Sequence, residues 1–288
     1  MQKRMSALFQ LPLDYAVWIL VLFGAFFAIH WLRRSFREPV RQKPTTAVEV
    51  PGENVKAFGT VQRLFHWSLF VVLGLVAFTG IDIFAPGVLG WFLSPFGISS
   101  VADSLFWHTA LLWVLLGMVV IHVAWDLAVA RGWHNIWPGR RDFSDTGVRL
   151  KNFFGATKEY PRSPKYDPFM KVFHWGTALS FVVLGISGIY LWNPYGLLPA
   201  IAPGFMNTLR LFHDVFAFLF VGLILGHIYF AVLPVNWPIL RSMATGTLSK
   251  EEYESEFDAD RWPVANLKPT LGAPMPAAAL RREEVERP

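Results

Sequence analysis

The chain has 288 residues, of which 53% are hydrophobic and only 16% are charged. A soluble domain has roughly a quarter of its residues charged, so this balance disfavours a soluble enzyme and favours a membrane protein. The chain contains no cysteine. Iron–sulfur clusters, covalently attached c-type haem and disulfides are therefore excluded from this chain, because each of them needs thiols.

Five apolar segments are each long enough to cross a bilayer as a helix, which takes roughly 20 residues. Backbone polar groups in lipid must be bonded within helices or closed barrels, and these segments show no two-residue alternation, so helices are expected. The predicted fold class is all-α, an integral membrane helical bundle. The segments are 13–32, 64–82, 104–127, 172–192 and 209–233.

The lysines and arginines predict how these helices cross the membrane. Seven of them lie in 33–63, nine in 127–171 and seven after residue 233, whereas 83–103 and 193–209 contain none. By the positive-inside rule, the basic stretches face the cytoplasm and the two uncharged loops face outward. Five crossings then put the N-terminus outside and the C-terminus in the cytoplasm. The net charge of +5 follows from this topology and needs no nucleic-acid partner.

The two ends of the chain differ from the apolar middle. A cleaved signal peptide over 1–28 is the alternative for the first segment, but it would leave the arginines that follow on the outer side. An uncleaved first helix is therefore expected. Residues 251–260 carry six acidic side chains and 263–288 are rich in Pro and Ala, so the last part is expected to be extended or disordered.

The third and fifth predicted helices each carry two histidines 14 residues apart, His108 and His122 in one, His213 and His227 in the other. Over 14 residues an α-helix rises about 21 Å and turns back to within about 40° of the face on which it started. Each helix thus presents two imidazoles on one face at two depths. Two such helices could hold two stacked b haems, with a histidine on either side of each iron.

The second and fourth predicted helices begin alike, with RLFHW at 63–67 and KVFHW at 171–175. In each of them a glycine follows the histidine after 14 residues, at Gly80 and Gly188. Little beyond a hydrogen fits between a helix and a flat macrocycle, so these glycines are predicted to make room for haem. The four helices together are therefore predicted to form two copies of one helical hairpin.

Three cations are candidates for binding the haem propionates. Arg63 and Lys171 stand three residues before a histidine, and each could pair with a propionate or merely obey the positive-inside rule. Arg210 lies on the outer side, where it could contact an outer propionate or a partner protein.

Zinc binding and proton relay are the alternatives to haem ligation for these histidines. Zinc fits poorly, because H-x13-H is too wide for one tetrahedral ion and no cysteine assists. The alternative from a different class is a haem-free membrane anchor or a transporter whose histidines relay protons, since intramembrane histidines often bond within a bundle.

Depth limits how the histidines can pair. His108 and His213 both follow an outer loop and make a natural outer pair. Symmetry would favour an inner pair of His122 with His227, and spacing does not exclude His66 with His227. Four histidines therefore compete for the inner position: His66, His122, His174 and His227.

Residues 58–262 resemble the cytochrome b (gamma) subunit of membrane-bound formate dehydrogenases, within a wider dihaem group that includes hydrogenase and thiosulfate-reductase membrane subunits. The resemblance implies a four-helix dihaem core over 58–240, preceded by an extra transmembrane helix and basic linker (1–57) and followed by a cytoplasmic tail (241–288). It rests on these elements: R-x-x-H-W at 63–67, T-G at 79–80, Lys165-Tyr166, the fourth-helix stretch to Pro194, H-x13-H-I-Y from His213, and the Met243–Gly246 turn.

The resemblance also implies the ligands of two b haems. The inner haem would be held by His66 and His227, and the outer haem by the histidines at 108 and 213. His122 and His174 are additions to the family pattern. They could support the haem ligands, contact quinone or form a further haem site.

The quinone site departs from the family. Its members have an Asn and a Gln where this chain has Asp167 and Met170. His174 and Asp167 could take their place as proton-coupled partners of the quinone.

The function implied is electron transfer in the bacterial inner membrane. The chain would carry electrons from an iron–sulfur subunit and a molybdopterin catalytic subunit through two haems to quinone, without itself acting on formate. The alternative within the redox class is the cytochrome b subunit of a hydrogenase or of a sulfur-compound oxidoreductase. Besides these subunits and quinone, membrane lipid is the expected partner.

Overall fold

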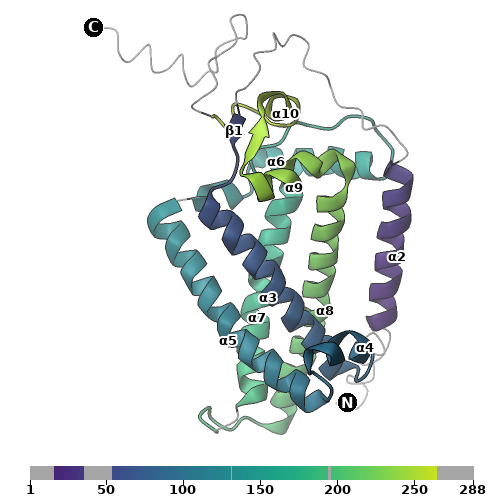
Figure 1. Cartoon of the computed structure of the whole chain (residues 1–288), viewed down its shortest axis with the longest axis vertical. Helices are drawn as coiled ribbons and strands as arrows, with labels where there is room; N and C mark the ends of the chain where they lie inside the picture. The colour runs from purple at the N-terminus through teal and green to yellow at the C-terminus, as the bar shows by residue number, and fades with distance from the viewer. Residues whose placement is uncertain (1–15, 36–53, 131, 194–195, 265–288) are drawn as a thin grey trace, which may run out of the picture.

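The computed structural model describes residues 16–35, 54–130, 132–193 and 196–264. Within them, four apolar helices are long enough to cross a membrane, and they run side by side along the long axis of the molecule (Figure 1). The predicted all-α membrane bundle is confirmed. The four helices are α3 (Thr60–Phe84), α5 (Val101–Trp125), α7 (Pro168–Trp192) and α8 (Pro203–Val232).

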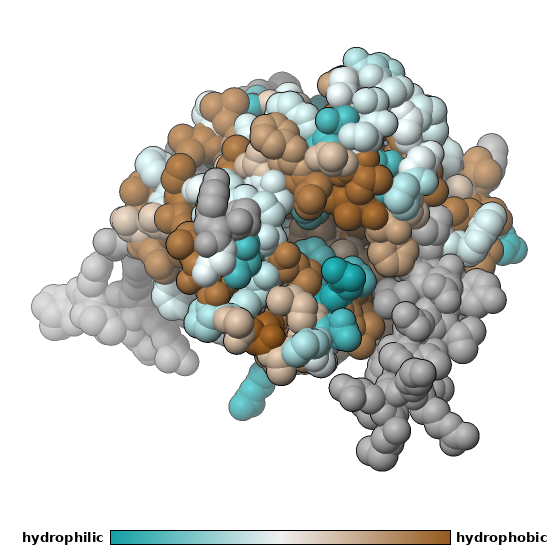
Figure 2. Space-filling model, turned by 90° about the horizontal axis from the view of Figure 1, so that it is seen from below, coloured by the Kyte–Doolittle hydropathy of each residue, from teal (hydrophilic) through white to brown (hydrophobic). Residues whose placement is uncertain are grey.

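The four helices form two hairpins. α3 packs mainly on α5 and α7 mainly on α8, whereas contacts between the two hairpins are sparse. Of the most apolar stretch of each helix, at most 11% is buried in the protein. The helices therefore do not pack tightly against one another along their whole length. Seen from below, the molecule is hollowed near its middle, and both hydrophobic and hydrophilic residues border the recess (Figure 2).

Capping residues explain where two of the helices begin. The Ser100 hydroxyl accepts a hydrogen bond from the Asp103 backbone N–H (3.2 Å), and the Asp103 carboxylate bonds back to Ser100, which is a capping box at the start of α5. Asp167 accepts from the Met170 N–H (2.9 Å) at the start of α7, where Pro168 stands at the first turn.

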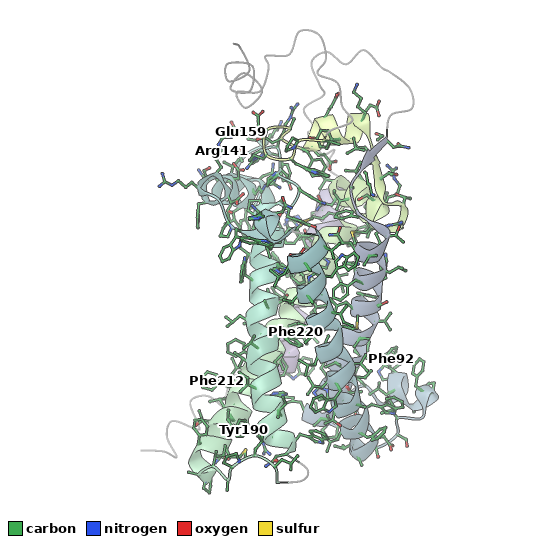
Figure 3. The ribbon with its side chains drawn as sticks, turned by 90° about the vertical axis from the view of Figure 1, so that its left-hand side faces the viewer. Phe92, Arg141, Glu159, Tyr190, Phe212 and Phe220 are labelled. Carbon is green, nitrogen blue, oxygen red and sulfur yellow. The ribbon has the colours of Figure 1, made fainter. Side chains whose placement is uncertain are left out.

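A set of short elements, called the cap, covers one end of the bundle, which we call the cap end. The opposite end, with α4 (Gly90–Leu93) and η1 (Ser94–Phe96), is the loop end (Figure 1). In Figure 3 the charged Arg141 and Glu159 lie at the cap end, whereas Tyr190 and Phe212 lie toward the loop end. The cap and the turns beside it comprise β1 (Asn54–Lys56), η2 (Asp126–Ala130, a π-helical turn), η3 (Gly132–Ile136), α6 (Arg140–Phe153), η4 (Pro234–Asn236), α9 (Trp237–Thr245), β2 (Thr247–Ser249) and α10 (Lys250–Glu256).

The two strands join residues far apart in the chain. β1 and β2 pair antiparallel, with Val55 opposite Leu248. Both of these residues belong to a buried apolar cluster with Ala57, Phe58, Tyr253 and Phe257. The predicted domain boundaries at 57/58 and 240/241 fall within the segments that form this strand pair and cluster, because the first part of the expected tail is folded into the cap. Residues 265–288, expected to be extended or disordered, lie outside the described residues.

The first apolar segment forms α2 (Ala16–Ser35), which packs on α8. His30 ties it to the bundle through hydrogen bonds to the Tyr229 hydroxyl and to the Phe153 carbonyl oxygen (2.9 Å to the latter). The apolar part of α2, Trp18–Arg33, is shorter than the four long helices. A fifth membrane crossing stays a prediction.

Candidate functional site

Six histidines lie on the four long helices, and all six are half-buried. His108 on α5 and His213 on α8 lie toward the loop end. The other four lie where α3 and α7 begin and α5 and α8 end, at the cap end: His66, His122, His174 and His227.

His108 and His213 face each other across the two hairpins, and we call them the loop-end pair. Their ring centroids are 6.5 Å apart. His108 Nδ1 lies 3.0 Å from the Val76 carbonyl oxygen and 3.2 Å from Thr79 Oγ1. His213 Nδ1 lies 3.0 Å from Ser187 Oγ. A hydrogen on Nδ1 that is held in this way leaves Nε2 free to bind a metal.

Gly80 and Gly188 stand next to these two hydroxyl residues. A Cβ at Gly80 would lie 3.1 Å from His108 Cε1, and one at Gly188 would lie 3.2 Å from His213 Cε1. In the structure the edge of an imidazole lies against each glycine, and room for a macrocycle beside them stays a prediction. The sequence reasoning missed Thr79 and Ser187 as partners of the imidazoles. The sequence feature that could have identified them is a hydroxyl side chain at the same position in both repeats.

His66 and His227 form the cap-end pair. Their ring centroids are 6.1 Å apart, and His227 also stacks on Phe173 (4.4 Å, 16°). His66 Nδ1 is buried without a hydrogen-bond partner among the described residues. The structure thus brings together the two residues that the resemblance implies, whereas the symmetric alternative would have paired His227 with His122.

His122 and His174 are the remaining two histidines of the cap end. The ring of Phe65 stacks on His122 at 4.5 Å and 13°. His174 lies within electrostatic range of His122, and Asp126 interacts electrostatically with both. These two imidazoles therefore share one part of the cap end, although their rings are not in contact as those of the cap-end pair are.

The spacing of the two ring pairs tests whether they fit a metal. Two imidazoles on one ion have ring centres about 6 Å apart, since each N–metal bond is about 2 Å and the nitrogen lies about 1 Å from the ring centre. The separations of 6.1 and 6.5 Å agree with this value. Among the described residues, no group of three or more His, Cys, Asp or Glu could hold a metal ion. The donor set fits haem iron with two imidazoles better than zinc.

Two of the predicted propionate partners form bonds within the protein. Lys171 is buried with its ammonium 2.7 Å from Asp142 Oδ2. Arg63 donates to the Ala244 carbonyl oxygen, while its Nε has no hydrogen-bond partner among the described residues. Both side chains attach their helices to the cap, and their role toward a propionate stays a prediction. Arg210 is exposed on α8.

The lead-in to α7 lies in the cap. Asp167, predicted for the quinone site, caps the helix and lies 3.9 Å from the Arg149 guanidinium. The Lys165 ammonium lies 5.4 Å from the ring centroid of Phe58 and 5.7 Å from that of Trp262. Burial among these rings lowers the pKa of Lys165, because the charged form loses hydration.

The chain is similar in sequence to known cytochrome b proteins. The chain matches the family model described as prokaryotic cytochrome b561 over residues 57–246. It is 26% identical over 172 residues to the formate dehydrogenase cytochrome b556 subunit of Haemophilus influenzae, covering 60% of this chain and 68% of that protein. It is 27% identical over 177 residues to the cytochrome b556(Fdn) subunit of the nitrate-inducible formate dehydrogenase of Escherichia coli K12, covering 59% and 74%. Since the family model spans more than half of the chain, this protein belongs to the prokaryotic cytochrome b561 family of membrane haem b proteins.

Proposed function

We propose that this chain is the membrane subunit that carries electrons from a peripheral formate dehydrogenase through two b haems to quinone. The observation that carries the proposal is the facing pair of histidines at each end of the bundle, with ring centroids 6.1 and 6.5 Å apart. Similarity to subunits named for formate dehydrogenase supports the choice of partner.

The histidines provide the ligands in this proposal. Haem iron with two imidazole ligands supplies reversible one-electron transfer. His66 and His227 would hold one haem at the cap end, and the loop-end pair would hold the other. Thr79 and Ser187 would accept the Nδ1 hydrogens of the loop-end imidazoles, which would fix the orientation of both rings and increase their basicity as ligands.

The two sites lie at different depths in the membrane. His213 and His227 are 14 residues apart on α8, which corresponds to a rise of about 21 Å. Moving one charge across the membrane against its potential stores about 2.3 kcal/mol per 100 mV. Transfer of electrons from one end of this bundle to the other is therefore a means of conserving energy.

The proposed orientation places the loop end outside and the cap end in the cytoplasm of a bacterium. The described parts of the basic loops, which the positive-inside rule keeps in the cytoplasm, lie at the cap end. An iron–sulfur subunit and a molybdopterin catalytic subunit would dock at the loop end, where Arg210 is exposed. Quinone would be reduced at the cap end, where Asp167 lies near the cytoplasm that supplies protons. α2 would add a fifth crossing or hold a partner.

The test is an absorbance spectrum of membranes that contain the full-length chain with its partner subunits. Dithionite should produce reduced b-type bands, and formate should produce the same bands when the partners are present. His66→Ala and His213→Ala should each lower the bands, whereas His134→Ala, a variant of an exposed histidine in η3, should not.

Three results would contradict this proposal. Absence of b-type bands after dithionite would favour the haem-free anchor or proton-relaying transporter. Reduction by hydrogen but not by formate would assign the chain to a hydrogenase. Reduction only by a reduced sulfur compound would assign it to a sulfur-compound oxidoreductase.

A further inference from the structure

The internal repeat extends to the ring contacts of the histidines. Exchanging hairpin α3–α5 with hairpin α7–α8 maps Phe65 onto Phe173 and His122 onto His227. Phe65 stacks on His122 at 4.5 Å and 13°, and Phe173 stacks on His227 at 4.4 Å and 16°. His122 thus has the same aromatic neighbour, in the same geometry, as a member of the cap-end pair.

His174 is the counterpart of His66 in the same exchange. Each is followed by a tryptophan that meets it edge-on, Trp67 at 89° and Trp175 at 88°. Each indole N–H donates to a backbone carbonyl oxygen at the cap end, at 3.0 and 3.1 Å. The starts of α3 and α7 are therefore held by equivalent contacts, and the two histidines lie at the same depth.

The loop-end and cap-end pairs behave differently under this exchange. The loop-end pair joins the same position of both hairpins, so the exchange maps it onto itself. The cap-end pair joins the start of α3 to the end of α8, so the exchange maps it onto a different pair. That second pair is His174, at the start of α7, with His122, at the end of α5.

The surroundings of the second pair leave both imidazoles available to a ligand. Neither His122 nor His174 forms a hydrogen bond with any residue that the structure describes. His30, by contrast, has a partner for each ring nitrogen. Asp126 is the nearby acidic group in electrostatic range of both imidazoles.

We propose that His122 and His174 ligate a third b haem at the cap end, related to the cap-end pair by the internal repeat. This inference rests on the proposed function, because it takes the cap-end pair as haem ligands. A bound quinone could accept hydrogen bonds at both carbonyl oxygens, but it would not require two histidines that the internal repeat relates to the cap-end pair. Two haem sites at the cap end would let the chain hold both electrons that reduction of quinone to quinol requires.

The experiment measures haem per chain in the full-length protein purified in detergent. The pyridine haemochrome assay, with chain concentration from amino-acid analysis, should give three haems per chain. His122→Leu and His174→Leu should each lose one haem, and the double variant should lose no more than either alone. His66→Leu should lose a different one, while the exposed control His134→Leu should retain all three.

A second variant separates ligand loss from misfolding. In His174→Gly, added imidazole should restore the third haem, because free imidazole can occupy the space of the missing side chain. Failure of this rescue in a protein that elutes normally from size exclusion would overturn the ligand role of His174.

The stoichiometry distinguishes failure of this inference from failure of the proposed function. Two haems in the unaltered chain, retained by His122→Leu and His174→Leu but reduced by His66→Leu, would overturn the third site and leave the proposed function intact. A chain without haem would overturn both.

Discussion

A hydroxyl residue and a glycine stand side by side in each hairpin, and both act on one imidazole of the loop-end pair. Thr79 Oγ1 lies 3.2 Å from His108 Nδ1, while Gly80 leaves the space that the edge of the same ring occupies. Ser187 and Gly188 do the same for His213. One residue sets the rotation of the ring, and the other sets how closely the helix approaches it.

We expect Gly80→Val to lose the loop-end haem. Its Cβ alone would lie 3.1 Å from His108 Cε1, so the ring must shift from its position opposite His213. Gly74→Val is the matched control, because it is on the same helix and its Cβ meets nothing within 4 Å. The haem content of the two purified variants should differ by one haem per chain. Equal haem content would show that this glycine does not position the ligand.

At the scale of elements, buried charges hold the long helices to the cap. The Lys171 ammonium on α7 lies 2.7 Å from Asp142 on α6, and the two side chains are only 9% and 8% exposed. Arg261, after α10, pairs with Asp145 of α6 at 2.7 Å. The second contact joins the predicted core (58–240) to the predicted tail (241–288).

We expect Asp142→Asn to destabilise the protein by about 3–5 kcal/mol, because it leaves the Lys171 charge buried without a carboxylate. Arg241→Ala breaks the pair with Glu252, in which the arginine is 56% exposed, and should cost at most about 1 kcal/mol. The free energy of unfolding is measured by circular dichroism during titration of mixed micelles with SDS. Similar losses in the two variants would contradict the importance of the buried pair.

The elements differ in how far they could be predicted from sequence. The four long helices and the histidines follow from long apolar runs and a repeated spacing, which need no knowledge of distant contacts. The strands β1 and β2 have three residues each, too few to show an alternating pattern. Their pairing depends on a cluster around Leu248 that forms only when distant segments meet. The partner of Lys171 was missed for the same reason.

At the scale of the whole molecule, the bundle is polarised from end to end. Charged side chains and the folded cap lie at one end, while the other end has short loops without lysine or arginine in 83–103 and 193–209. A membrane orients a bundle of this kind by its basic end. The positions of the two ends relative to the membrane are therefore open to a direct measurement.

We expect a cysteine at the loop end to be labelled from outside the cell and a cysteine in the cap to be protected. The chain has no cysteine of its own, so an introduced cysteine is the only thiol in it that the reagent can label. Leu197→Cys is suitable for the loop end because this side chain is 82% exposed, and Lys158→Cys places an exposed probe in the cap. A membrane-impermeant maleimide applied to intact spheroplasts should modify only the first. The reverse pattern would invert the proposed orientation.

The pairing of β1 with β2 has a consequence for how the protein is made. Lys56 lies opposite Thr247, so the first strand leaves the ribosome with its partner still to be synthesised. At 5–20 residues per second, the strand waits roughly 10–40 s for its partner. All four long helices are synthesised within that interval. The ladder therefore closes only on a chain whose spanning helices are complete, and a truncated product would display an open strand edge that quality-control proteases and chaperones can bind.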